Sequence, residues 1–374
     1  MLSCGILSAD WYDGDWPYRV KITVDDAEVD ADLDNFPVYV DLSDLPAEFH
    51  TNVNQTDARD IRVTEADGTT EVARQVVFYT AGSDTGELHF LAEGTAGLTA
   101  TGDTEFYIYY GNAAATMPAE DATYGSENVW DPTYIAVYHL QESRSTTAGN
   151  YIDATDGDND GQLTDADSDT VQGTGMFDGK AVDFSGDGNP SDYIQVGALG
   201  PTGDVTISFW INAVGHPGAN GDTALAVGNW IAGGRGNYGL FWYDDYSDNQ
   251  RIMLARDGNA YRVSDPPGYG GSWMYMTGTR DGSTVKLYVD STNQATKTSV
   301  ASTINTGDVW RIGAAQSAWD SVDGIIDEVR VSTNALSVAW IAAEYSNQNA
   351  PATFYTVGAE EANATERRLF ITYW

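Results

Sequence analysis

The chain has 374 residues, of which 18 are Lys or Arg and 56 are Asp or Glu, so its formal net charge at pH 7 is −38. This charge excludes a nucleic-acid-binding protein, which needs Lys and Arg to neutralise phosphates, and it argues against docking on an anionic membrane. A hydrophobic content of 42%, with 12% aromatic residues, indicates folded domains rather than a disordered acidic chain.

The first half of the sequence is predicted to form short β-strands separated by turns. Apolar and polar residues alternate at 18–24 and at 37–42, as they do in half-buried strands. Asp67-Gly68 marks a hairpin, because Asp-Gly tolerates the positive φ of such turns. A spacing of about 8–12 residues between turns predicts a β-sandwich. The other strands of this half are expected at 60–64, 72–78, 87–91 and 105–110.

The second half follows a change in composition. Residues 113–130 are small, polar and include proline, so we expect a linker there. Beyond it, Asp281-Gly282 marks a second hairpin, and one helix is predicted at 337–345 with Ser337 as its N-cap. The strands of this half are expected at 134–140, 181–184, 193–196, 205–212, 239–243, 252–255, 273–280, 285–289, 309–313 and 324–331.

Several classes of feature are missing from the sequence. The single cysteine, Cys4, excludes an intrachain disulfide and a cysteine-based zinc site. No apolar run approaches the ~20 residues of a membrane-spanning helix. The first residues lack the basic and apolar regions of a signal peptide. If Met1 is the natural start, we expect release in a particle by lysis rather than ordinary secretion; a processed or truncated secreted protein is the alternative.

The kind of acidity favours a protein adapted to high salt. Lysine occurs only at Lys21, Lys180, Lys286 and Lys297, and the other basic residues are arginine. Repulsion among so many negative charges opposes a compact fold in dilute buffer, and molar salt removes most of it by shortening the Debye length to about 3 Å. A calcium-rich or simply solubilising surface is the alternative.

The order of motifs resembles a known pair of domains. WPYRVKI at 16–22, FPVYV at 36–40, DIRV at 60–63 and IYYGN at 108–112 resemble a small domain of unknown function found in surface and secreted proteins. The second half is similar to the laminin-G-like, concanavalin A-like domain that typically follows it. The motifs of this second resemblance are GKAVDF at 179–184, DYIQV at 192–196, VTISFW at 205–210, KLYVD at 286–290, GIIDEVR at 324–330, ALSVAWI at 335–341 and EYSNQ at 344–348.

The resemblance implies an all-β chain, with a small N-terminal β-sandwich followed by a concanavalin A-like jelly-roll β-sandwich. It also implies a location outside the cell or on a particle surface, and no single activity. The expected divisions are an N-terminal extension at 1–15, the small sandwich at 16–112, a linker at 113–130, the concanavalin A-like domain at 131–360 and a C-terminal tail at 361–374.

The motifs argue against an enzyme. Glycoside hydrolysis needs two carboxylates about 5–9 Å apart, and glucanases of the resembling fold carry Glu-x-Asp-x-x-Glu on one strand, a pattern absent from this sequence. The nearest segment, IDEVR at 326–330, has adjacent carboxylates that should point to opposite faces of a strand. We therefore interpret Asp327 as structural. Neither a Gly-x-Ser-x-Gly motif nor a phosphate-binding loop occurs.

Calcium is the cofactor that the acidic motifs favour. DGDNDG at 156–161 matches the core of a calcium loop, with Asp167 in place of the usual bidentate Glu. DGNPSD at 187–192, together with Asp327, resembles the structural calcium site of concanavalin A-like relatives. The alternative for both is a set of turn-forming aspartates on an acidic surface. The candidate calcium ligands are Asp156, Asp158, Asp160, Asp167, Asp187, Asp192 and Asp327.

Aromatic residues favour a glycan site, since their rings can stack on the apolar faces of sugars. Trp210, Trp273 and Trp340 lie in motifs of the resembling family and are assigned to packing. Most of the others gather between 229 and 270, where the glycine-rich run NWIAGGRGNY (229–238) has aromatic residues near both ends. Core packing and subunit contact are the alternatives. The candidate glycan-binding residues are Trp230, Arg235, Tyr238, Tyr243, Tyr246, Tyr269 and Trp319.

The sequence thus favours a non-catalytic surface protein that recognises a glycan or glycoprotein. We expect a virion component, a tail fibre or spike of a virus of a halophile. A purely structural spacer of a virion or cell surface is the first alternative, and a secreted glycan-acting protein is the second. The C-terminal tail, with Phe370, Tyr373 and Trp374, is predicted to pair with a neighbouring copy, a trimer being one possibility, or with other virion proteins. A disordered tail is the alternative.

Overall fold

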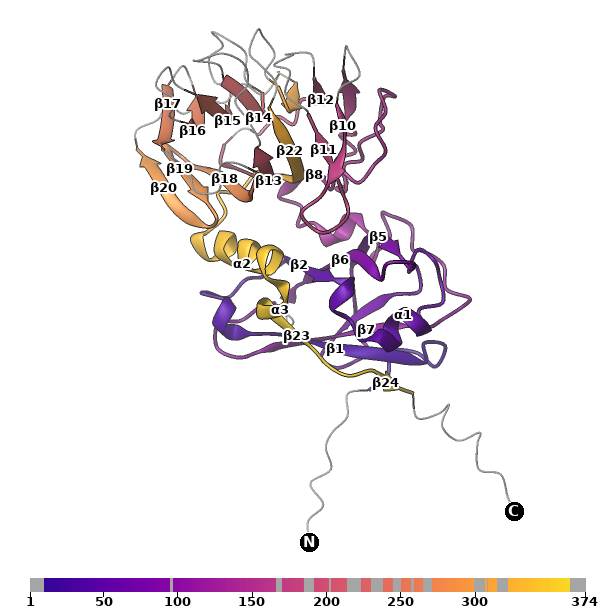
Figure 1. Cartoon of the computed structure of the whole chain (residues 1–374). Helices are drawn as coiled ribbons and strands as arrows, with labels where there is room; N and C mark the ends of the chain where they lie inside the picture. Colours follow the sequence, from indigo (N-terminus) through magenta and orange to yellow (C-terminus); the bar gives the residue numbers. More distant parts are fainter. Residues whose placement is uncertain are drawn as a thin grey trace, which may run out of the picture. The chain divides into compact units, whose positions relative to one another are not determined.

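The chain divides into two compact units, each built mainly of antiparallel strands (Figure 1). Unit 1 comprises the residues up to Asp131 and those from Ser346 onward, and unit 2 comprises Pro132–Tyr345. This composition confirms the predicted all-β fold class. The computed structural model describes residues 10–94, 97–165, 170–184, 192–201, 203–213, 223–229, 238–244, 250–256, 259–264, 271–298, 307, 309–314 and 322–363, with the backbone alone at 223–226, 238, 241–244, 250–256 and 259–264.

Unit 1 is a sandwich of two sheets. The larger has the strand order β23-β1-β7-β3-β4, with β24 also paired to β1, and the smaller has the order β2-β6-β5. The strands are β1 (Tyr18–Val24), β2 (Phe36–Asp41), β3 (Arg62–Glu65), β4 (Glu71–Val72), β5 (Arg74–Thr80), β6 (Thr85–Ala92), β7 (Thr104–Tyr110), β23 (Tyr355–Val357) and β24 (Glu361–Ala362). The short helices are η1 (Asp26–Glu28), η2 (Leu42–Asp44), α1 (Ala47–Asn52), η4 (Glu127–Val129) and α3 (Pro351–Phe354).

The core of unit 1 follows from the alternation in its strands. Val20 and Ile22 of β1 are fully buried, whereas Lys21 between them is not. The ring centres of Phe106 in the larger sheet and Phe90 in the smaller sheet lie 4.7 Å apart, and this contact joins the two sheets. The predicted Asp67-Gly68 turn is confirmed: it connects β3 and β4, and Gly68 has a φ of +78°.

The last described residues complete unit 1, which differs from the expected domain bounds. β23 and β24 both pair with β1, at Ile22↔Val357 and at Tyr18↔Ala362 (Figure 1, yellow beside indigo). Residues 355–362 therefore cover an edge of β1 that would otherwise expose unpaired backbone groups. The expected linker also belongs to this unit, because Trp130 is buried with its ring 5.4 Å from His89.

Unit 2 is a larger sandwich. One sheet has the order β10-β11-β22-β13-β18-β19-β20, with β8 also paired to β22, and the other has the order β17-β16-β15-β14-β21-β12-β9. Its strands are β8 (Tyr134–Tyr138), β9 (Gln162–Thr164), β10 (Val171–Thr174), β11 (Lys180–Asp183), β12 (Tyr193–Val196), β13 (Val205–Ala213), β14 (Thr223–Gly228), β15 (Tyr238–Asp244), β16 (Gln250–Arg256), β17 (Asn259–Ser264), β18 (Trp273–Asp281), β19 (Thr284–Val289), β20 (Thr292–Lys297), β21 (Trp310–Ile312) and β22 (Gly324–Ser332).

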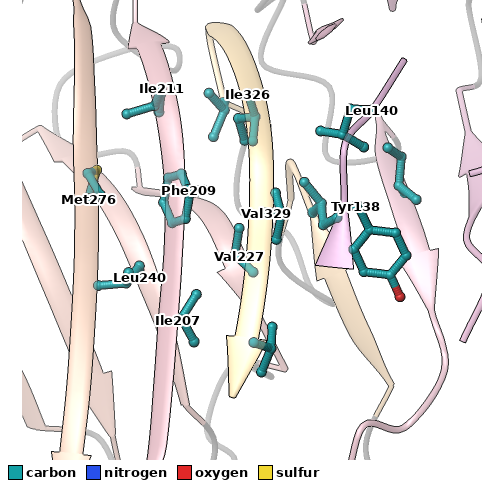
Figure 2. Packing of buried hydrophobic residues seen from close by; sticks show 14 of the residues in the cluster. Tyr138, Leu140, Ile207, Phe209, Ile211, Val227, Leu240, Met276, Ile326 and Val329 are labelled. Carbon is teal, nitrogen blue, oxygen red and sulfur yellow. The ribbon is translucent and has the colours of Figure 1, made fainter. Parts of the chain in front are cut away.

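One hydrophobic cluster fills the space between the two sheets of unit 2. Figure 2 shows Phe209 of β13 and Val329 of β22, from the first sheet, with Val227 of β14 and Leu240 of β15 from the second. The predicted hairpin at Asp281-Gly282 joins β18 to β19 and is confirmed. Trp210 is buried as predicted, although its ring lies outside this cluster and stacks 5.9 Å from Tyr345.

The alternation breaks in the middle of β22. Ile326 and Val329 both join the core, which leaves two residues between them instead of one. The register with β13 shifts at this point, and Glu328 has a φ of +49°. Such a bulge places one extra residue on the strand. Asp327 and Glu328 are therefore both outside the core cluster, and the prediction that they alternate between opposite faces was wrong.

The predicted helix is longer than expected. α2 spans Val338–Asn349, and its N-cap is confirmed because the backbone N–H of Trp340 donates to Ser337 Oγ at 3.1 Å. Its residues through Tyr345 belong to unit 2, and the remainder to unit 1. Among the residues described, neither this helix nor any other has the length and apolarity to cross a membrane.

Candidate functional site

Three paired strands of unit 2 present a polar strip on the side of their sheet that faces away from the core. Leu163, Ile194 and Ile312 are buried in the core cluster. Because neighbouring residues along a strand point to opposite faces, the residues beside them lie on the outer face. These outward residues are Gln162 and Thr164 of β9, Tyr193 and Gln195 of β12, and Arg311 of β21. None of the five is acidic, in a chain with a net charge of −38.

Tyr193 and Arg311 form the centre of this strip. Gln195 of β12 lies directly opposite Arg311 of β21, so Tyr193, two residues before Gln195, is the diagonal neighbour of Arg311. The guanidinium carbon of Arg311 lies 3.7 Å from the centre of the Tyr193 ring, a close cation–π contact. Desolvation by burial lowers the pKa of Arg311, which arginine tolerates without losing its proton at neutral pH. The pair offers an aromatic surface and N–H donors at one place.

The same face continues across β14 and β15. Gly228 pairs with Arg311 on one side and with Gly239 on the other. Position 243 belongs to the same alternate set of β15 as Gly239, whereas position 238 belongs to the set of the buried Leu240. Of the predicted glycan-binding residues, Tyr238 and Tyr243 are thus placed on β15 by their backbone. Trp230, Arg235, Tyr246, Tyr269 and Trp319 lie outside the described residues.

Sequence reasoning missed Tyr193 and Arg311. The alternation around Ile194 and Ile312 indicates that both residues face outward, so that part of the signal was present. What the sequence does not give is the pairing of β12 with β21, which brings the two side chains together.

The predicted calcium loop at 156–161 is organised by a residue that the sequence analysis did not select. Asp153, only 4% exposed, accepts hydrogen bonds on Oδ1 from Val137 N, Thr155 N and Thr155 Oγ1, and on Oδ2 from Asn159 N and Nδ2, at 2.9–3.2 Å. Asp160 Oδ1 in turn accepts from Asp153 N at 2.9 Å. These bonds hold the loop through its own backbone.

The calcium assignment of this loop stays a prediction. Asp156, Asp158 and Asp160 are all exposed, and Asp158 has a φ of +48°. In the described part of the chain, they are not among the groups of three or more acidic or histidine side chains whose ligand atoms lie within 4.8 Å of one another. Asp167 lies outside the described residues.

Asp327 and Asp192, the other described calcium candidates, are both fully buried. Asp327 accepts from Met176 N at 2.8 Å and from Glu328 N at 3.0 Å. Gly175 is required beside it, because a Cβ there would lie 2.6 Å from Asp327 Oδ2. Asp192 directly precedes β12, which belongs to the other sheet, and Asp187 lies outside the described residues. The contacts of Asp327 agree with the structural role predicted for it.

A buried network on the outer side of the first sheet of unit 2 was not predicted. Arg330 donates to Glu344 at 2.6 Å and to Glu328 at 2.9 Å, and both carboxylates are at most 1% exposed. Burial lowers the pKa of Arg330, but the facing carboxylates outweigh that effect and raise it overall. Tyr275 Oη donates to Glu344 at 2.6 Å, and Glu328 Oε1 lies 2.6 Å from His139 Nδ1. These contacts fix α2 to the sheet and occupy Glu328.

Unit 1 contains one described group of carboxylates with the spacing of metal ligands. The carboxylate oxygens of Asp25, Asp26 and Asp103 lie within 4.8 Å of one another. Two of them already accept hydrogen bonds from backbone N–H groups, Asp25 from Ala27 and Asp103 from Asp26. An exposed acidic group with such contacts is typical of turns and helix N-termini.

Comparison with known proteins gives a match to part of unit 2. Residues 187–342 match the family model described as the concanavalin A-like lectin/glucanases superfamily. No curated protein gives a significant match to the sequence. The resemblance of residues 16–112 to a domain of unknown function therefore stays a prediction.

Several solved structures are similar at low sequence identity. Domain 4 of AbnA, a GH43 extracellular arabinanase from Geobacillus stearothermophilus in complex with arabinotriose, is 15% identical; the match covers 56% of this chain and 97% of that one, with a TM-score of 0.43. The serotype D botulinum neurotoxin ligand-binding domain in complex with N-acetylneuraminic acid is 14% identical, with 58% and 51% covered and a TM-score of 0.42.

The binding domain of Paraclostridial Mosquitocidal Protein 1 is also 14% identical, with 57% of this chain and 52% of that chain covered and a TM-score of 0.41. The match thus spans about half the length of each toxin domain. Together with the two packed antiparallel sheets described above, the family match shows that residues 187–342 carry a concanavalin A-like lectin/glucanase domain.

Proposed function

We propose that unit 2 is a non-catalytic recognition module that binds a glycan or glycoprotein at the outer face of its seven-stranded sheet. The observation that carries this proposal is the contact of Tyr193 with Arg311, in a strip whose other residues are Gln162, Thr164 and Gln195. A sugar ring has apolar C–H faces that pack on aromatic or guanidinium planes, and hydroxyls that need donors and acceptors. Tyr193, Arg311 and the amides of Gln162 and Gln195 supply all of these.

A hydrolase is less well supported, because the adjacent carboxylates of β22, Asp327 and Glu328, are already engaged in hydrogen bonds within the fold. Glu328 is held by Arg330 and lies against His139, and Asp327 accepts from two backbone N–H groups. Both carboxyl groups are buried, whereas a general acid or nucleophile must reach the glycosidic bond.

Glycan binding by the full-length protein tests the proposal. An oligosaccharide array that includes sialylated and arabinose-containing glycans would identify a ligand, and titration calorimetry would give its affinity. We expect Tyr193→Ala and Gln195→Ala to weaken binding about tenfold, the effect of losing roughly 1.4 kcal/mol of contact. Gln172→Ala is the matched control, because Gln172 is exposed on β10 of the other sheet.

Two results would change the assignment. If Trp230→Ala abolishes binding while Tyr193→Ala has no effect, the site lies in the aromatic segment predicted at 229–270. If no glycan binds at any salt concentration, the alternative of a structural spacer replaces the proposal.

We further propose that the protein works in high salt and binds structural calcium. Its −38 charge supports the first point, since screening would remove the repulsion. Circular dichroism should show unfolding on dilution from molar to millimolar salt, and a native spectrum in dilute buffer would contradict this. Calcium should raise the melting temperature, and Asp156→Asn should reduce that rise if the loop at 156–161 is the site.

Placement on a virion and assembly through the tails are proposals that rest on the sequence. Residues 1–9 and 364–374 lie outside the described residues. Light scattering in molar salt should give the mass of an oligomer, a trimer being one possibility. Deleting 365–374 should lower that mass without unfolding either unit, and an unchanged mass would count against a role for the tail.

A further inference from the structure

Unit 1 contains a cavity of about 180 Å³ at the beginning of β5. Arg74 and Val76 of β5 line one side. Met117, Pro118, Glu120 and Ser126, from the segment that follows β7, line the other. The sequence predicts a linker for this segment, whereas in the structure it forms one wall of the cavity. The space is large enough for a carboxylate with a short aliphatic stem.

Arg74 is the only cationic residue in the wall of this cavity, and its guanidinium lacks hydrogen-bond acceptors for part of its N–H groups. The side chain is 1% exposed, and its Nε donates to Ile61 O at 2.5 Å. Within the described residues, Nη2 is buried without a hydrogen-bond partner, and no carboxylate lies within salt-bridge distance of the guanidinium. A buried donor left without an acceptor costs about 1–3 kcal/mol, more when it is charged.

The nearby carboxylates do not accept hydrogen bonds from Arg74, because they are engaged with other groups. Arg62 takes the nearby acceptors: its guanidinium donates to the carbonyls of Ile61 and Thr116 and lies 3.4 Å from Glu71. Asp60 Oδ2 already accepts from Asn54 N and Gly111 N, both at 2.9 Å. Burial lowers the pKa of Arg74 to about 9, with a further contribution from the charge of Arg62, so the guanidinium remains protonated at neutral pH.

We propose that this cavity binds a carboxylate, which Arg74 receives and which the apolar side chains of Val76, Met117 and Pro118 hold by its aliphatic stem. A guanidinium matches a planar carboxylate by two parallel N–H···O bonds. Because Nε already donates to Ile61 O and Nη2 is buried, the guanidinium has to shift toward the cavity to make them. Ser126 brings a hydroxyl to the same cavity. Glu120 in the wall disfavours a dianion such as sulfate or phosphate, because its own charge repels the second negative charge. The site is in unit 1 and does not depend on glycan binding by unit 2.

The carboxylate can come from a free small acid or from an acidic side chain of a partner protein. Acetate and a peptide with one Glu side chain and both ends blocked are the probes for these two sources. Tighter binding of the peptide than of acetate assigns the site to a protein partner, and equal affinity assigns it to a small acid. Either result supports a carboxylate site.

The test uses the full-length protein at pH 7, with sodium chloride adjusted to keep the ionic strength constant. Acetate should give saturation-transfer NMR signals that an excess of sulfate does not displace, and it should raise the melting temperature by more than sulfate does at equal ionic strength. Glu120→Gln should bind acetate several-fold more tightly, because it removes a nearby negative charge. Arg74→Lys should bind at least tenfold more weakly. Arg59→Lys is the matched control, an exposed arginine of the same unit whose partner is Asp57.

Arg74 is buried, so its variant can fail to fold. Met117→Trp provides the second test: Met117 is 45% exposed, and a larger side chain there should fill the cavity without touching the fold. Acetate should then lose its effect while the melting temperature in chloride stays the same. The proposal is overturned if acetate has no effect on the wild-type protein, if sulfate acts as strongly, or if Met117→Trp leaves acetate binding intact.

Discussion

Arg330 of unit 2 is held in a different way from Arg19 and Arg62 of unit 1. In unit 2, Arg330 lies between two buried carboxylates, Glu328 and Glu344. In unit 1, Arg19 and Arg62 are held mostly by neutral groups. Arg19 donates to Asp10 O and Tyr109 Oη, both at 2.8 Å, and packs on the Tyr107 ring at 4.0 Å. Arg62 donates to three backbone carbonyls.

This difference shows that a chain with 56 acidic residues does not use them uniformly. Carbonyls and rings provide most of the contacts of Arg19 and Arg62, and each arginine also has one carboxylate beside it, Glu361 at 2.7 Å and Glu71 at 3.4 Å. Arg74 differs from both, because no carboxylate of the described residues lies within salt-bridge distance of its guanidinium, as an anion site requires. The Arg330 network pairs a buried guanidinium with two carboxylates, which suits it to fixing one element on another, in this case α2 on the sheet.

Removing the charge of Arg330 should have the largest effect. Arg330→Met leaves Glu328 and Glu344 buried without their partner, and we expect unit 2 to lose about 3–5 kcal/mol of unfolding free energy. Denaturant unfolding followed by hydrogen exchange at β13 and β22 measures this loss. Arg59→Met, at an exposed pair with Asp57, should leave the exchange unchanged. Equal protection of β22 in the two variants would show that the network is dispensable.

Much of this architecture could be predicted from the sequence, and the failures have identifiable causes. Strands such as β1, β7 and β13 were found because their apolar residues alternate, and both Asp-Gly hairpins because glycine permits positive φ. Two of the missed strands, β23 and β24, have only two or three residues and form by pairing with distant β1. Local sequence contains no record of such a pairing. The six-residue strands β14, β17 and β20 were missed as well.

The sites were harder to predict than the strands. The bulge in β22 depends on Glu328 adopting a φ of +49°, which is rare for a residue other than glycine. No sequence motif predicts this conformation. The Tyr193–Arg311 contact and the Arg74 cavity both join segments that are far apart in the sequence. Motif reasoning selected runs of aspartate instead, and at 156–161 it passed over Asp153, which accepts most of the hydrogen bonds that hold the loop.

A smaller loss is expected when the geometry of an arginine in unit 1 is changed. Arg19→Lys keeps the charge but cannot reach Asp10 O, Tyr109 Oη and Glu361 together, so we expect about 1–3 kcal/mol of destabilisation. Glu361→Gln should cost less than 1 kcal/mol, because Glu361 is 48% exposed. Hydrogen exchange in β1 and β7 measures both. A larger loss for Glu361→Gln would mean that unit 1 also relies on carboxylate pairing.

The smallest expected effect concerns Glu142, a carboxylate of unit 2 whose described contacts include no ion pair with an arginine. Glu142 Oε1 accepts from Ile152 N at 3.0 Å, and within the described residues Oε2 is buried without a hydrogen-bond partner. Burial raises the pKa of Glu142 above its ordinary value of 4.5. The native state therefore binds this proton more tightly than the unfolded chain does, and the contribution of Glu142 to stability falls as the pH rises through the two pKa values.

Glu142→Gln remains neutral at every pH and should remove this dependence. We expect the variant to be slightly more stable than the wild-type protein at pH 7 and nearly equal to it at pH 4, when each is compared with Glu93→Gln, a change at an exposed carboxylate of unit 1. Melting temperatures across this range measure the difference. A variant that is less stable at pH 7 would show that the ionised carboxylate is favourably bound, as those of the Arg330 network are.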